Sequence, residues 1–147
     1  MKLPAPRLSV LAALAVLSLA LVLPAFAPNP ELSDVMDEMK ARLKALGGAL
    51  AAKDEPASLE AVSAMQGLAL QAKGYIPVGT SKLPKEAQAA HVKAFRKELL
   101  GLLRHLADLE TEVLDGSWDT ATQHATVTLK QVRDAAHDRF QEQEQPR

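Results

Sequence analysis

The sequence predicts an all-α protein, built as an antiparallel up-down-up-down four-helix bundle. Four stretches of the 147-residue chain carry apolar residues at spacings mainly of three and four, which places them on one face of a helix. No stretch shows the strict apolar-polar alternation of a half-buried strand. Two of the three connections between the stretches are short, and short connections favour antiparallel neighbours.

The first 27 residues are predicted to be a secretory signal peptide. Lys2 and Arg7 flank the start of an apolar run from Leu8 to Leu23, and Ala25-Phe26-Ala27 has the small-x-small pattern of a cleavage site. A retained membrane anchor is the alternative, because about 20 apolar residues span a hydrocarbon core, and Pro28 fits a cleavage site poorly. Cleavage would leave a protein of the bacterial periplasm without a membrane anchor.

Residues 28–147 form one predicted domain, since about 120 residues suffice for a single core. They carry 15 Lys and Arg against 18 Asp and Glu, a net charge of −3, which argues against nucleic-acid binding. The chain has no cysteine. This excludes disulfides, iron–sulfur clusters, cysteine-ligated zinc and thioether attachment of haem.

The first two helices are separated by a polar break at 53–56, and the second runs from about Pro56 to Lys73. Gly74 stands where a helix C-cap is expected. The first apolar stripe is Leu32, Val35, Met36, Met39, Leu43, Leu46 and Leu50, and the second is Leu59, Val62, Met65, Leu68 or Ala69, and Ala72.

A long connection covers residues 74–84, which have two prolines and no helical period, and its Tyr75 and Ile76 are expected to cover one end of the core. The third helix is predicted from about Lys85 to Leu114, and Ser117 or Asp119 then caps the fourth. The stripe of the third helix is Val92, Phe95, Leu99, Leu102, Leu106, Leu109 and Val113, and that of the fourth is Ala121, Ala125, Leu129, Val132, Ala136 and Phe140.

Met36 and His137 are predicted to lie at the same end of this bundle. Met36 is about one turn inside the first helix and His137 about one turn from the end of the fourth, so their heights agree at a rise of about 1.5 Å per residue. Each residue alone has an ordinary interpretation. A helical Met is commonly core filler, and a His near a helix C-terminus commonly interacts with the helix dipole.

Met36 and His137 each lie in a segment of distinctive sequence. The two segments are Glu31-Leu-Ser-Asp-Val-Met36-Asp-Glu-Met-Lys-Ala-Arg-Leu-Lys44 and Leu129-Lys-Gln-Val-Arg133-Asp-Ala-Ala-His137-Asp-Arg-Phe140. Both resemble the cytochrome b562 family, as does Lys93-Ala-Phe95-Arg96 in the third helix. The resemblance implies a soluble periplasmic electron carrier. It also implies one non-covalent b-type haem, whose iron takes Met36 and His137 as axial ligands. The sequence departs from the family at Ala136, Leu99 and Gln141, and the first two changes thin the aromatic lining of the haem pocket.

The implied cofactor is b-type because Arg133 and Ala136 stand where a covalent Cys-x-x-Cys-His motif would place cysteines. With both axial positions filled, iron has no open site, so outer-sphere transfer of single electrons to redox partner proteins is expected, and no enzyme activity. Arg133 would pair with a propionate or with the acidic surface. The apolar side chains that would exclude water from the haem are Met39, Met65, Phe95, Leu99 and Phe140, although each also fits plain bundle core.

The alternative function is that of a haem-free periplasmic helical bundle, a regulator, chaperone or metal- or ligand-binding module. His91, His105 and His124 form no His-x-x-x-His or Glu-x-x-His pair on one helical face, and His105-x-x-Asp108 is a lone candidate. A specific zinc or copper site is therefore not expected. No Ser/His/Asp arrangement or phosphate-binding loop is discernible.

Overall fold

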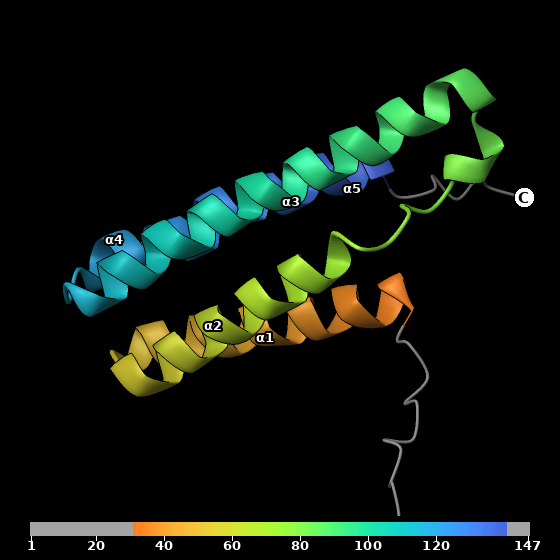
Figure 1. The fold of residues 1–147 in the computed structure, drawn as a ribbon. Helices are drawn as coiled ribbons and strands as arrows, with labels where there is room; N and C mark the ends of the chain where they lie inside the picture. Colours follow the sequence, from red (N-terminus) through yellow and green to blue (C-terminus); the bar gives the residue numbers. More distant parts are fainter. Residues whose placement is uncertain (1–30, 141–147) are drawn as a thin grey trace, which may run out of the picture.

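The computed structural model describes residues 31–140, and this range is helical with no strand, which confirms the all-α prediction. Figure 1 shows the helices α1 (Leu32–Ala52), α2 (Glu55–Ala72) and α3 (Lys85–Leu114) as three long rods. A fourth rod consists of α4 (Trp118–Gln123), a π-helical turn η2 (His124–Thr128) and α5 (Leu129–Phe140). The predicted signal peptide, residues 1–27, lies outside the described residues. None of the described helices is long and apolar enough to cross a membrane.

A turn of only two residues joins α1 to α2. Lys53 adopts a left-handed conformation with φ 54°, and its N–H donates to Leu50 O at 3.0 Å. The Asp54 N–H donates to Ala49 O at 2.9 Å, which completes the paired bonds of a Schellman ending. The Asp54 carboxylate also accepts the Ala57 N–H at 3.1 Å and caps α2. This turn sets α1 and α2 side by side as a hairpin (Figure 1).

The connection between α2 and α3 is irregular, as predicted, apart from one 3-10 turn, η1 (Thr80–Lys82). The prediction for Tyr75 was right, because it packs against the core, but the prediction for Ile76 was wrong, because 69 % of its surface is exposed. Successive side chains of an extended segment point to opposite sides. Tyr75 and the buried Pro77 therefore face inward, and Ile76 between them faces solvent.

The interior is divided into two clusters of apolar side chains at opposite ends of the helices. The first cluster lies where α2 begins and α3 ends, and its buried members are Leu46, Leu50, Ala61, Val62, Met65, Leu106, Leu109, Val113, Ala121, Ala125 and Leu129. The second cluster lies where α1 and α3 begin and α5 ends, and its buried members are Val35, Ala72, Phe95, Leu99 and Phe140.

The helices enclose these two clusters unequally. At the first cluster α1 approaches α4 and η2, so all four rods meet. At the second cluster α5 packs against α3, and no Cα atom of α5 lies within 8 Å of a Cα atom of α1. The helix backbones are therefore close together at one end, called the closed end here, and farther apart between α1 and α5 at the other, the open end, where side chains of the second cluster lie between them.

Candidate functional site

The second cluster brings together four of the residues that the sequence singles out. Phe95, Leu99 and Phe140 are buried members, and the half-buried Met36 packs against them. Three separate helices supply these side chains: Met36 comes from α1, Phe95 and Leu99 from α3, and Phe140 from α5. The predicted meeting of the start of the first helix with the end of the fourth is thus found in the structure.

Phe140 ties the end of α5 to the start of α3. Its ring centroid lies 5.3 Å from that of Phe95 with the planes at 72°, an edge-to-face arrangement that aromatic pairs prefer. The Arg139 guanidinium lies 5.4 Å from the centroid of the Phe140 ring and donates to the Glu98 carboxylate at 3.1 Å. These contacts fix the end of α5 against α3.

His137 itself is exposed, whereas the residue before it packs inward. Ala136 packs against the second cluster, as Met36 does. One residue step turns a helix by about 100°, which accounts for an inward Ala136 and an outward His137. The structure therefore places Met36 inside and the His137 imidazole at the surface of the same end.

Three further predicted residues lie away from the second cluster. Met65 is buried in the first cluster, and Met39 packs against that cluster too. Arg133 is exposed and donates two hydrogen bonds to the Asp134 carboxylate, at 2.9 Å from Nε and 2.6 Å from Nη2. The Arg133 bond, followed by weaker attraction to Lys130 and His137, lowers the pKa of Asp134 from its ordinary value of 3.8.

A cationic groove of about 450 Å³ runs between α1 and α5. Lys40 and Lys44 from α1 and Arg133 from α5 line it together with Asp37, and Arg133 is also hydrogen-bonded to the Asp134 carboxylate. Asp37 directly follows Met36, and Arg133 lies one turn before His137. Neither predicted ligand lines the groove itself, although residues next to each of them do, and its cations suit carboxylate groups such as the propionates of a haem.

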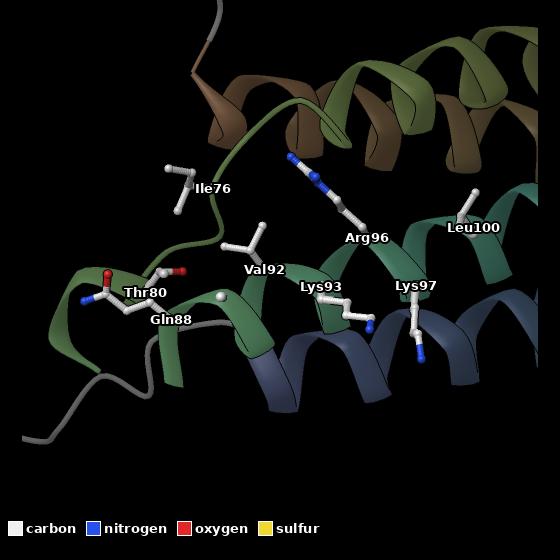
Figure 2. Close-up of a pocket in the computed structure, with 9 residues that line it drawn as sticks. Ile76, Thr80, Gln88, Val92, Lys93, Arg96, Lys97 and Leu100 are labelled. Atoms are coloured by element: carbon white, nitrogen blue, oxygen red, sulfur yellow. The ribbon is translucent and has the colours of Figure 1, made fainter. Parts of the chain in front are cut away.

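A second groove, of about 580 Å³, lies on the outer side of α3 near the α2–α3 connection. Figure 2 shows the side chains of Lys93, Arg96 and Lys97 along this groove, with Ile76 and Val92 at one end. None of the predicted site residues lines this groove, although Lys93 and Arg96 belong to the segment that resembles the cytochrome b562 family. The sequence does not reveal this groove, because the exposure of Ile76 and Val78 depends on the path of the α2–α3 connection.

Two arrangements of histidines also escaped sequence reasoning. The His91 Nε2 atom is buried without a hydrogen-bond partner, and its ring lies 5.1 Å from that of Phe140, beside the second cluster. His105 Nδ1 lies 3.2 Å from His124 Nε2, and His124 Nδ1 lies 3.1 Å from both carboxylate oxygens of Glu112. A search for pairs within one helix finds neither arrangement, because both join side chains of different helical segments.

Comparison of the chain with protein-family models gives no match, and comparison with curated proteins gives no significant match either.

Proposed function

We propose that this protein is a periplasmic electron carrier that binds one non-covalent b-type haem, with Met36 and His137 as the axial ligands of the iron. An up-down-up-down course of the four helical rods is part of the proposal. The observation that carries it is the packing of Met36 in one cluster with Ala136 and Phe140, which lie one residue before His137 and three residues after it. The resemblance of both segments to the cytochrome b562 family supports the same pair.

The residues around the second cluster fit a haem in their chemistry. The open face between α1 and α5 gives the macrocycle an entry, and Phe95, Leu99 and Phe140 supply apolar surface that excludes water. Lys40, Lys44 and Arg133 would hold the propionates at the mouth. When bound, the iron supplies a reversible change of one electron.

The two ligands differ in what they require of the chain. Met36 offers a soft, neutral thioether that favours ferrous iron and raises the reduction potential relative to two imidazoles. The exposed His137 side chain must turn toward the α1–α5 groove to bind. A ring nitrogen that does not bind iron then needs a hydrogen-bond partner to hold the imidazole in place.

The competing proposal is a haem-free bundle, a periplasmic regulator, chaperone or ligand-binding module. Exposure of His137 favours it, and so does the near-complete burial of Val35 and Phe140, at 2 % and 7 % exposure. In this proposal the second cluster is only a part of the core.

Absorption spectra of the purified full chain with added haemin distinguish the two proposals. In the oxidised and reduced forms, wild type should give the bands of low-spin, six-coordinate iron, and Met36→Ala and His137→Ala should lose them. Met39→Ala is the matched control for methionine, because Met39 lies on α1 but packs with the first cluster. His105→Ala is the control for histidine, because His105 lies beside His124 at the other end of the helices. Failure of wild type to bind haemin, or unchanged spectra in Met36→Ala and His137→Ala, would refute the cytochrome proposal.

A further inference from the structure

We propose that His105 and His124 form a binding site for one divalent late transition-metal ion, such as Cu²⁺ or Zn²⁺, with Glu112 orienting His124. This site lies at the closed end of the bundle, where α3 ends and η2 begins, and it is separate from the second cluster. It does not depend on haem binding.

The two imidazoles already converge at a distance that suits a shared metal ion. His105 Nδ1 and His124 Nε2 are 3.2 Å apart, with ring centroids at 5.3 Å and ring planes at 88°. Two nitrogens bound to zinc at about 2.0–2.1 Å and at a tetrahedral angle lie about 3.3 Å apart. An ion can therefore replace the shared hydrogen with little movement of either ring, provided that this hydrogen leaves His105 Nδ1 for the His105 Nε2 atom or for solvent, so that both facing nitrogens present a lone pair.

Glu112 prepares His124 for this role. Both carboxylate oxygens lie 3.1 Å from His124 Nδ1, so that nitrogen carries the hydrogen and donates it to the carboxylate. The lone pair of a neutral His124 then resides on Nε2, which faces His105. Proteins commonly orient a metal-binding imidazole by such a carboxylate. The side chains are well enclosed, with 11 % of His124 and 22 % of Glu112 exposed.

Backbone and charge support a cation at this place. His124 is the first residue of η2, and π-helical turns are rare and are frequent at functional sites. The last turns of α3 carry Asp108, Glu110 and Glu112, and carbonyl groups give the C-terminal end of a helix a negative potential. The acidic side chains and the helix carbonyl groups both attract a positive ion.

The protein supplies two nitrogen ligands, and water completes the coordination. Residues 31–140 contain no group of three or more His, Asp or Glu side chains already placed around one ion. Two imidazoles and water suit Cu²⁺ best among the divalent ions, because the stability of such complexes is highest for copper.

Titration calorimetry of the haem-free full chain with CuCl₂, and separately with ZnCl₂, tests the site. Wild type should bind one ion per chain, and His105→Gln and His124→Ala should abolish this binding. Glu112→Gln should weaken it by roughly 10- to 100-fold, the usual effect of removing a carboxylate that orients a ligand. His91→Gln is the matched control and should bind as wild type does.

Two further measurements keep the result unambiguous. Far-ultraviolet circular dichroism must show that each variant is folded, and the conservative His105→Gln preserves most of the side-chain volume if His124→Ala unfolds. Electron paramagnetic resonance of the Cu²⁺ complex should show coupling to two nitrogens. The proposal is wrong if wild type binds no stoichiometric ion, or if His105→Gln and His124→Ala keep the wild-type affinity.

Discussion

Replacement of Phe140 by alanine separates the proposed haem site from the stability of the fold. Phe140 is 7 % exposed and packs edge-to-face on Phe95. A buried Phe→Ala change costs about 3–5 kcal/mol, and we expect about 3 kcal/mol because the chain can relax at a helix end. Leu109→Ala is the matched change in the first cluster, where Leu109 is 0 % exposed and a loss of about 2–5 kcal/mol is expected.

Urea unfolding followed at 222 nm measures both losses. A slope of about 1–3 kcal/mol per molar urea converts 3 kcal/mol into a midpoint lowered by about 1–3 M. A domain stable by about 5–15 kcal/mol remains mostly folded after a loss of about 3 kcal/mol, and circular dichroism checks that each variant is folded before it is titrated. Haemin titration of the folded protein should then show at least tenfold weaker binding for Phe140→Ala and wild-type binding for Leu109→Ala. Equal affinities in the two variants would refute the assignment of haem to the second cluster.

Three further predictions concern single side chains. Asp54→Ala removes the acceptor of the Ala57 N–H and should destabilise the protein by about 1 kcal/mol, measured as a lower urea midpoint. Ser58→Ala removes a fully buried hydroxyl that has no partner among the described residues. This change should leave the free energy of unfolding unchanged or raise it by up to about 1 kcal/mol, measured as an equal or higher urea midpoint. Arg133 lowers the pKa of the exposed Asp134, so the stability that this carboxylate contributes is present above its ordinary pKa of 3.8 and is lost as the pH falls through its lower folded value. Arg133→Gln should return the pKa of Asp134 toward 3.8, as carboxyl ¹³C titration would show.

Helix positions followed closely from the spacing of apolar residues and from the breaks between stripes. The third helix was predicted from Lys85 to Leu114 and has those bounds. The second was predicted from about Pro56 to Lys73 and runs from Glu55 to Ala72. Proline within the first turn of the second helix is a local feature that the sequence shows, whereas the left-handed Lys53 has no such sign, because Gly and Asn are the usual residues in that conformation.

The π-helical turn was not predicted, although the sequence holds a sign of it. Ala121, Ala125 and Leu129 follow each other at two successive intervals of four, and each interval turns an ordinary helix about 40° beyond a full turn. A π turn holds more residues and absorbs this drift, so all three side chains stay buried. The prediction for the fourth helix is a uniform α-helix, because spacings of three and of four both fit an ordinary helix.

The split between Met36 and Met39 shows what periodicity cannot supply. Both belong to one predicted stripe of α1, yet they pack with different clusters. A stripe defines a face of the helix, but the point along it where one cluster ends depends on side chains from other helices. Met65 was expected near the haem for the same reason, and it packs with the first cluster.

Sites made from several helices depend on helix rotation, and one residue step of about 100° decides whether an imidazole is inside or outside. Ala136 and His137 show both outcomes on α5. Phe140 packs on Phe95 and Arg139 donates to Glu98, so the end of α5 is held on α3. A change of the His137 rotamer, rather than a rotation of α5, is therefore the expected way to bring the imidazole toward the groove. The first cluster lies at the other end of the helices, so haem binding should reorganise the open end while the closed end keeps its packing.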